Sequence, residues 1–283
     1  MTKKAVLTTG VLTVLIAISA FLFYNVKADG KLDKKDYVQS TTPTLFFHGY
    51  GSSANAERHM TNAAKEAGVT KTVIRANVDR NGTVTLRGDI PKGAINPIVE
   101  VNYEDNRNPI DVGRYAKAVV SKLQEKYGFT KMNMVGHSLG NMSILYYLLE
   151  HAQDENLPQL QKQVNIANFA AGLEAMGMGL SSDVKVDKTT GQPNQVTQTF
   201  QRLLPLREVF PQNQIDVLNI YGDYKNGSDG SVLNSSSRSL KYLVADNAKS
   251  YQEKKITGKL AQHSQLHENP EVDKILIQFL WGK

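Results

Sequence analysis

The ten residues KMNMVGHSLG, at positions 131–140, contain the most informative pattern of this chain. Residues 131–135 predict a short buried strand, and the run Leu139–Ala152 has the length and composition of a helix. Between them lies Gly-x-Ser-x-Gly, which places Ser138 in a tight turn from strand to helix. Side chains in place of the two glycines would collide with the strand and the helix. We therefore predict that Ser138 faces the free N–H groups of a helix N-terminus, which favour a developing negative charge. The alternative is a glycine-rich turn with an incidental serine.

The rest of the chain alternates short apolar runs with longer helical patterns, which is typical of βα units around a mainly parallel sheet. The predicted strands are Thr44–Phe47, Thr72–Asn77, Thr83–Arg87, Pro97–Asn102, Lys131–Val135, Gln163–Phe169, Ile215–Tyr221 and Lys254–Thr257. The predicted helices are Asn55–Ala67, Asp111–Tyr127, Leu139–Ala152, Val232–Ala245 and Pro270–Trp281. Residues 172–212 follow neither period, and we interpret them as an insertion over the sheet with short helices at 175–180 and 197–206.

A second glycine-rich turn occurs earlier, in LFFHGYGS at residues 45–52. An apolar strand runs directly into His-Gly-x-Gly, and the glycines let the backbone approach a substrate closely. A plain turn after a buried strand is the alternative. We expect His48 to brace this loop and not to transfer protons.

A serine that acts as a nucleophile needs a histidine to accept its proton and a carboxylate to orient the histidine. Two aspartates, Asp223 and Asp229, follow the late strand that ends at Tyr221. Two histidines, His263 and His267, follow the last predicted strand and precede the final helix. The residue types alone leave both choices open.

Four blocks of sequence together resemble one family. They are the serine turn at 136–140, FHGYG at 47–51, SDGSV at 228–232 and QHSQLHEN at 262–269. Their order and gaps are similar to those of the α/β hydrolases, in particular the uncharacterised exported or surface hydrolases of Gram-positive bacteria, which resemble small lipases and esterases. The similarity runs from about Thr44 to the C-terminus. One departure is Asn141, where a glycine is frequent, and we expect the first helical turn to tolerate it.

The resemblance implies an α/β-hydrolase fold with the order serine, acid, histidine. Asp229 lies in Asp-Gly-Ser-Val, which resembles the Asp-Gly-x-Val of many lipases, whereas Asp223 better fits a turn or a helix N-cap. His263 matches the His-x-x-Leu of related lipases, which leaves His267 as a packing residue or a residue at the N-terminus of the final helix. The expected catalytic residues are therefore Ser138, Asp229 and His263.

The resemblance also implies an oxyanion hole formed by the backbone N–H groups of Tyr50 and Leu139. We expect hydrolysis of a small-molecule or lipid ester, with residues 172–212 as a cap whose segment 175–180 is a candidate lining of an acyl pocket. Two alternatives are a cell-surface acyltransferase acting on a wall polymer and a non-enzymatic surface-binding module. Peptidase and thioesterase activities use the same residues.

The N-terminus predicts export. Lys3 and Lys4 precede an uncharged run at residues 5–24, which as a helix would span roughly 30 Å, the thickness of a bilayer core. The lysines should stay in the cytoplasm, so the remainder should lie outside. We interpret residues 1–28 as either a cleaved signal peptide or an uncleaved membrane anchor, residues 29–43 as a charged linker, and residues 44–283 as the hydrolase domain.

The composition excludes several classes of protein. Of the 33 basic residues, Lys3, Lys4 and Lys27 belong to the N-terminal segment, which leaves 30 against 27 acidic residues and gives no argument for nucleic acid. The chain has no cysteine, so disulfides and thiolate metal sites are excluded. No metal-binding or phosphate-binding motif is present, and we expect no cofactor. We expect a monomer, either extracellular or anchored on the outer face of the membrane.

Overall fold

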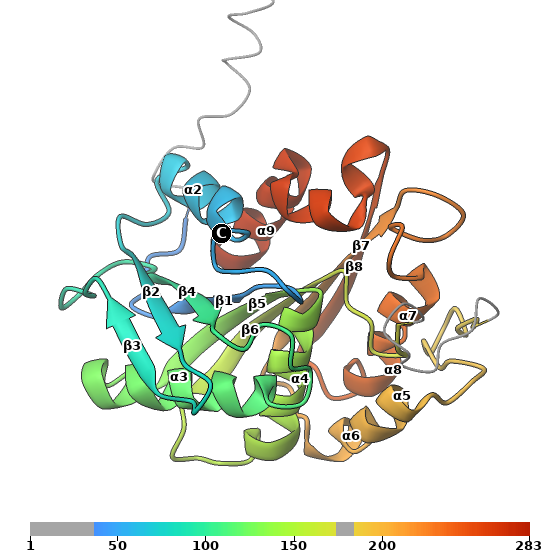
Figure 1. Cartoon of the computed structure of the whole chain (residues 1–283), viewed down its shortest axis with the longest axis horizontal. Coiled ribbons are helices and arrows are strands. Elements are labelled where there is room, and N and C mark those ends of the chain that lie inside the picture. Colours follow the sequence, from blue (N-terminus) through green and yellow to red (C-terminus); the bar gives the residue numbers. More distant parts are fainter. Residues whose placement is uncertain (1–36, 174–183) are drawn as a thin grey trace, which may run out of the picture. The chain divides into compact units, whose positions relative to one another are not determined.

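The computed structural model describes residues 37–173 and 184–283 (Figure 1). Its centre is an eight-stranded sheet in the order β3-β2-β4-β1-β5-β6-β7-β8. All neighbouring strands pair in parallel except β3, which is antiparallel to β2. The strands are β1 Thr44–Phe47, β2 Val73–Val78, β3 Val84–Arg87, β4 Ile98–Tyr103, β5 Lys131–His137, β6 Gln159–Ile166, β7 Asp216–Asp223 and β8 Ser250–Thr257. The predicted parallel α/β architecture is confirmed.

Helices cover both faces of the sheet, with α2 and α9 on one side and α3 and α4 on the other (Figure 1). The helices are α2 Arg58–Glu66, α3 Val112–Tyr127, α4 Leu139–His151, α5 Gln198–Leu203, α6 Leu206–Val209, α7 Asn234–Arg238, α8 Leu240–Val244 and α9 Pro270–Trp281. Two 3₁₀ helices, η3 at Lys259–Ala261 and η4 at His263–Glu268, connect β8 to α9. Successive residues of β1 alternate between the two cores, since Phe46 packs with the α2–α9 side while Leu45 and Phe47 pack with the other.

Two elements differ from the sequence prediction for local reasons. Strand β6 ends at Ile166 and not at Phe169, because Ala167 takes a positive φ of 50° that leaves the extended region. The single helix predicted at 232–245 is divided into α7 and α8. This segment is rich in serine, and the Ser239 hydroxyl donates to the Ser236 carbonyl oxygen over 2.7 Å, a local bond that competes with continuous helix.

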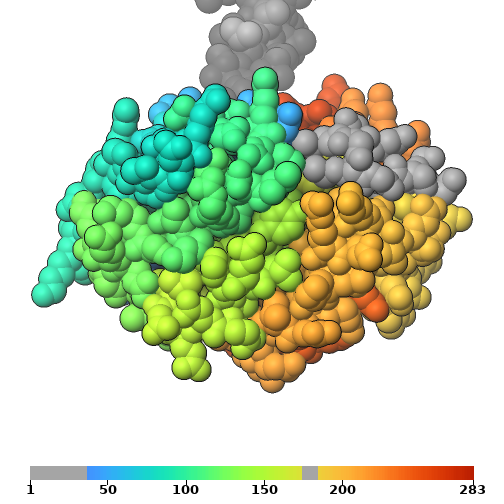
Figure 2. All heavy atoms as spheres, turned by 60° about the horizontal axis from the view of Figure 1, so that its bottom comes forward, coloured from blue at the N-terminus to red at the C-terminus, as the bar shows by residue number. Residues whose placement is uncertain are grey.

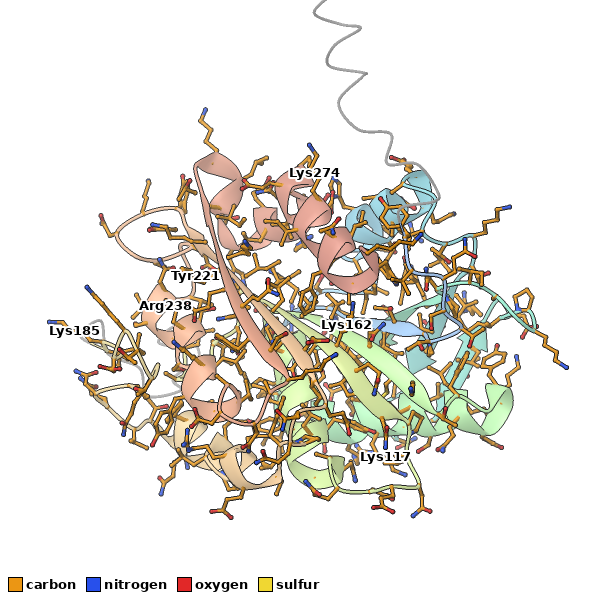
Figure 3. All side chains as sticks on the ribbon, turned by 180° about the vertical axis from the view of Figure 1, so that it is seen from behind. Lys117, Lys162, Lys185, Tyr221, Arg238 and Lys274 are labelled. Carbon is orange, nitrogen blue, oxygen red and sulfur yellow. The ribbon has the colours of Figure 1, made fainter. Side chains whose placement is uncertain are left out.

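The last helix is bonded to the sheet by a partly buried cation. The Lys162 ammonium on β6 donates to the carbonyl oxygens of Phe279 and Leu280 at 2.8 and 2.9 Å, which satisfies the last turn of α9. Figure 3 shows Lys162 between the sheet and this helix. Burial lowers the pKa of Lys162, and Asp216 opposes this shift. Tyr37, the first described residue, is already buried and forms an antiparallel β-bridge with Gly282. The packed part of the chain therefore begins before β1.

Residues 184–212 extend the helical layer that contains α4. The buried side chains Phe200, Leu203, Leu206 and Phe210 belong to the same core as α3 and α4. Figure 2 shows the outer surface of this layer, where α3, α4 and the α5–α6 segment adjoin one another. Residues 174–183, which include the predicted helix at 175–180, lie outside the described residues, so the cap stays a prediction. Residues 1–28 lie outside them as well. Among the helices that are described, none is both long and apolar enough to cross a membrane.

One buried carboxyl group stands out in the α2–α9 core. Glu57, directly before α2, is fully buried, and neither of its carboxyl oxygens has a hydrogen-bond partner in residues 37–173 or 184–283. Burial, together with the nearby Glu100 and Glu268, raises the pKa of Glu57 well above its usual value. The folded protein therefore binds a proton at Glu57 that the unfolded chain has already released, so this group lowers the free energy of unfolding as the pH rises above about 4.3.

We expect Glu57→Gln to raise the melting temperature at pH 8 by at least about 3 °C, because the amide keeps the shape and does not ionise. The gain should shrink toward pH 4, where the carboxyl is mostly protonated in the unfolded chain as well. Differential scanning fluorimetry across this pH range measures the effect, and Glu66→Gln on the exposed face of α2 is the matched control. If the melting temperatures of Glu57→Gln and the wild type changed with pH in the same way, Glu57 would not be uncharged in the folded protein.

Candidate active site

Ser138 occupies a strained turn between β5 and α4. Its backbone angles are φ 52° and ψ −118°, a conformation that a non-glycine residue adopts only when its surroundings impose it. The Ser138 N–H donates to the Ile166 carbonyl oxygen at the end of β6 over 3.0 Å. The predicted strand–turn–helix around this serine is therefore present, and it holds the side chain at the carboxyl edge of the sheet.

The two glycines of the motif are required by close backbone contacts. A Cβ at Gly140 would lie 2.0 Å from the Phe47 carbonyl oxygen on β1. A Cβ at Gly136 would lie 2.6 Å from the Gly140 carbonyl carbon. Both distances are far below van der Waals contact, so no other residue fits without moving the strand or the helix. The collisions predicted from the sequence are thus present as specific atom pairs.

Asn141, which stands where the related motif frequently has a glycine, forms hydrogen bonds that stabilise the serine turn. Its side chain is fully buried, and its amide nitrogen donates to the carbonyl oxygens of Ser138 and Ile166, each at 2.8 Å. These two bonds tie the turn to the end of β6. The sequence prediction assigned no role to Asn141, because its position in the first helical turn does not indicate where the side chain points.

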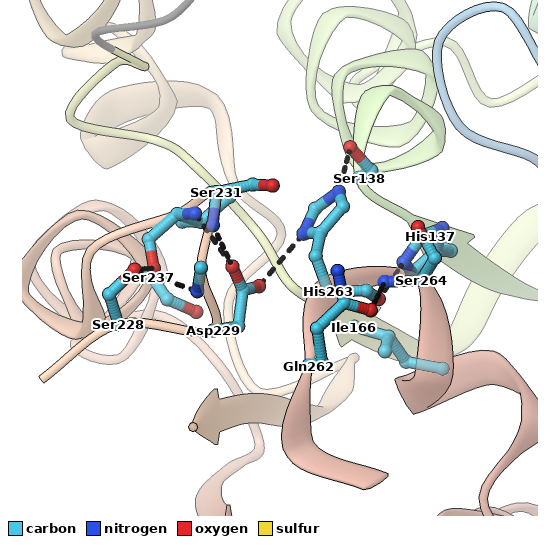
Figure 4. A network of polar contacts seen from close by, with 12 residues as sticks. His137, Ser138, Ile166, Ser228, Asp229, Ser231, Ser237, Gln262, His263 and Ser264 are labelled. Atoms are coloured by element: carbon cyan, nitrogen blue, oxygen red, sulfur yellow. Dashed lines mark hydrogen bonds and ion pairs between the residues drawn. The ribbon is translucent and has the colours of Figure 1, made fainter. Parts of the chain in front are cut away.

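A continuous chain of hydrogen bonds connects Ser138, His263 and Asp229 (Figure 4). The Ser138 Oγ lies 3.0 Å from the His263 Nε2, and the His263 Nδ1 lies 2.8 Å from the Asp229 Oδ2. With the Nδ1 proton donated to the carboxylate, Nε2 is free to accept the serine proton. A hydroxyl, an imidazole and a carboxylate in this order can generate a nucleophile at neutral pH.

Asp229 is held in place by its own turn. It is 1 % exposed, and its Oδ1 accepts the N–H groups of Ser231 and Val232 at 2.8 and 2.7 Å, which leaves Oδ2 for His263. The backbone repeats the connection, because the His263 N–H donates to the Asp229 carbonyl oxygen over 2.8 Å. Asp223, the rival candidate, instead accepts the Gly227 N–H at 3.2 Å and pairs with Lys255 at 3.3 Å.

A second histidine supports the first. The His137 Nε2 lies 3.0 Å from the His263 carbonyl oxygen, so this ring nitrogen donates and fixes the backbone of His263. Burial, together with His263 and His267, lowers the pKa of His137 well below its usual value, so the ring is neutral at pH 7. Sequence reasoning missed this role, because the contact joins residues 126 positions apart and no spacing rule indicates it.

His267 does not reach the serine. Its ring packs edge-on against His137, with centroids 4.7 Å apart, and its Nδ1 lies 3.1 Å from the Glu268 carboxylate. Burial lowers the pKa of His267, and Glu268 opposes the shift. The arrangement agrees with the packing role expected from the sequence.

The glycine-rich loop after β1 passes directly beside Ser138. A Cβ at Gly49 would lie 3.2 Å from the Ser138 Cβ. Within residues 37–173 and 184–283, the backbone N–H groups of Tyr50 and Leu139 have no hydrogen-bond partner. These are the two donors that the resemblance implies for an oxyanion hole. Leu139 directly follows Ser138 in the chain, and Tyr50 directly follows Gly49, which adjoins Ser138 in space.

His48 braces this loop. Its Nδ1 donates to the Gly49 carbonyl oxygen at 2.9 Å, and its Nε2 accepts the Tyr103 N–H at 3.1 Å. One donor and one acceptor define a neutral ring. Burial lowers the pKa of His48, which agrees with that state. In the part of the chain that the structure describes, no group of three or more histidine or carboxylate side chains is arranged to hold a metal ion.

Comparison with known proteins places the fold and the family. Residues 31–283 match a family model described as "Alpha/beta hydrolase of unknown function (DUF915)". A solved structure of the lin2722 gene product from Listeria innocua is similar, with 28% identity, a TM-score of 0.75, and coverage of 85% of this chain and 94% of that one.

A second similar structure is a candidate cell surface hydrolase from Lactobacillus plantarum WCFS1. It has 20% identity and a TM-score of 0.67, and the match covers 84% of this chain and 89% of that one. No curated protein matches the sequence significantly. The family match spans nearly the whole chain and includes every residue of the site around Ser138, so the protein belongs to this family of alpha/beta hydrolases of unknown function.

Proposed function

We propose that this protein is a serine hydrolase that cleaves carboxylic esters through an acyl-enzyme on Ser138. The observation that carries the proposal is the unbroken chain from the Ser138 Oγ through the His263 ring to the Asp229 carboxylate, with bonds of 3.0 and 2.8 Å. The strained turn at Ser138 supports it, because such strain persists at sites where a side chain must be presented to a ligand.

The geometry supports a reaction in two halves. The Ser138 Oγ attacks the ester carbonyl carbon while its proton passes to the His263 Nε2, and the N–H groups of Tyr50 and Leu139 stabilise the oxyanion. The C–O bond then breaks, and the alcohol leaves with the proton from His263. Water attacks the acyl-enzyme in the same way, with His263 taking its proton, and the carboxylic acid leaves as Ser138 is restored.

The proposed site of action is outside the cytoplasmic membrane. Support comes from the export signal predicted at residues 1–28 and from the similarity to a candidate cell surface hydrolase. A small-molecule or lipid ester is the proposed substrate. Cleavage of an ester releases an alcohol, which leaves more readily than the amine released from an amide, so it needs fewer catalytic groups beyond Ser138, His263 and Asp229.

The test combines labelling with turnover. A fluorophosphonate probe should modify the protein at Ser138, as located by mass spectrometry of the labelled peptide. The same preparation should hydrolyse p-nitrophenyl esters from acetate to palmitate. The acyl chain length with the highest kcat/KM would indicate the length of the acyl pocket. If Ser138 stays unlabelled and no ester is cleaved, the proposal is wrong.

A further inference from the structure

The loop between β4 and α3, residues 104–111, is hydrogen-bonded to the glycine-rich loop beside Ser138. The Gly51 N–H donates to the Asn106 carbonyl oxygen over 2.7 Å, and the Asn106 amide nitrogen donates to the Ser52 carbonyl oxygen over 2.6 Å. These reciprocal bonds make the position of residue 107 depend on the loop that carries the proposed oxyanion donor, although more than fifty positions separate them in the sequence.

The side chain of Arg107 lies against this loop. Its Nε is 3.5 Å from the position that a Cβ at Gly51 would occupy, and Gly51 has a φ of +65°, which favours glycine. Gly49, two residues earlier, adjoins Ser138. Two residues of chain span at most roughly 7 Å, so the guanidinium lies within reach of a substrate bound at Ser138.

Arg107 has no counter-ion in the described parts of the chain, 37–173 and 184–283. It is exposed, and no hydrogen bond or ion pair is formed by its guanidinium there. The acidic groups of the same loop are engaged elsewhere. Glu104 pairs with Arg80 at 3.3 Å, Asp105 accepts the Asn108 amide at 3.1 Å, and Asp111 pairs with Arg114 at 3.4 Å. Arg107 is therefore a cation that lies against the glycine-rich loop and that the acidic groups of its own loop leave unpaired.

We propose that Arg107 is a specificity-determining residue that binds an anionic group on the substrate, a carboxylate or a phosphate. The inference rests on the proposed function and narrows its substrate class to esters that carry a negative charge some distance from the reacting carbonyl. A guanidinium suits this role because it is always charged and its planar donors match both kinds of oxyanion.

The test compares two esters of equal chain length with the full-length protein. Mono-p-nitrophenyl suberate carries a terminal carboxylate, and p-nitrophenyl octanoate is its neutral counterpart. The measured quantity is the ratio of kcat/KM for the anionic ester to kcat/KM for the neutral one. A p-nitrophenyl ester with a terminal phosphonate in place of the carboxylate distinguishes the two anion classes.

We expect Arg107→Gln to lower this ratio roughly fivefold to tenfold, as for a single charge contact near the surface. Arg107→Glu should lower it further, Arg107→Lys should retain part of it, and 0.5 M salt should weaken the wild-type preference. Arg80→Gln, which removes a paired arginine, is the matched control and should leave the ratio unchanged.

Two other results would overturn the inference in different ways. If the wild type cleaves both esters and Arg107→Gln leaves the ratio unchanged, Arg107 does not select the substrate, while the proposed function stands. If the wild type cleaves none of these esters and Ser138 resists labelling, the proposed function and the inference both fail.

Discussion

Ser138→Ala should lower kcat/KM for p-nitrophenyl esters by about 10⁴- to 10⁶-fold, while the protein stays folded. The substitution removes the atom that would form the acyl-enzyme, the hydroxyl that lies 3.0 Å from the His263 Nε2. The rate that remains would come from substrate binding and the oxyanion donors alone.

The fold should survive this change. The Ser138 Oγ has a single hydrogen-bond partner among the described residues, the Nε2 of the partly exposed His263, so alanine removes only this one bond. Alanine also has the same difficulty as serine in adopting a φ of 52°, so the strain of the turn is unchanged.

The measurement is steady-state hydrolysis together with circular dichroism and a melting curve of each variant. Ser264→Ala is the matched control, because this exposed serine directly follows His263 and its hydroxyl is outside the chain of bonds at the site. Hydrolysis by Ser138→Ala at a rate comparable with that of the Ser264→Ala control would exclude Ser138 as the nucleophile.

The parts of this structure that could be predicted from the sequence are those that depend on local sterics. The serine turn is one, because the need for Gly136 and Gly140 follows from backbone packing over a few residues, and the flanking strand and helix have clear periods. The final helix is another. It begins with Asn269 as its N-cap and Pro270 in its first turn, and its predicted bounds match the structure.

The parts that could not be predicted depend on contacts between distant segments. His137 supports His263 from 126 positions away, and Asn141 joins the turn to β6, yet neither contact leaves a pattern in the sequence. Arg107 is similar, since bonds between its loop and residues 51–52 place it beside the glycine-rich loop. The choice between Asp223 and Asp229 needed family resemblance, because both aspartates suit a turn after β7.

The second large effect that we expect concerns the choice of Asp229 over Asp223 as the carboxylate that orients His263. Asp229→Asn should lower kcat at pH 7 by about 10⁴-fold, because it changes which nitrogen of His263 carries the proton. The Asn oxygen can still accept the N–H groups of Ser231 and Val232, so the turn is kept. The amide nitrogen then faces the His263 Nδ1 as a donor. The ring must turn Nδ1 into an acceptor and place its proton on Nε2, where it can no longer take the proton of Ser138.

Asp223→Asn is the matched control, since Asp223 ends β7, the strand that precedes Asp229, and pairs with Lys255 at the surface. We expect its kcat to stay within about twofold of the wild type, because an exposed ion pair contributes little even to stability. Stopped-flow or plate-based ester hydrolysis measures both variants, and melting curves establish that each is folded. A large loss in Asp223→Asn with little loss in Asp229→Asn would reverse the assignment of the acid. Comparable small losses in both would mean that His263 does not depend on either carboxylate to accept the serine proton, and the orienting role proposed for Asp229 would then be wrong.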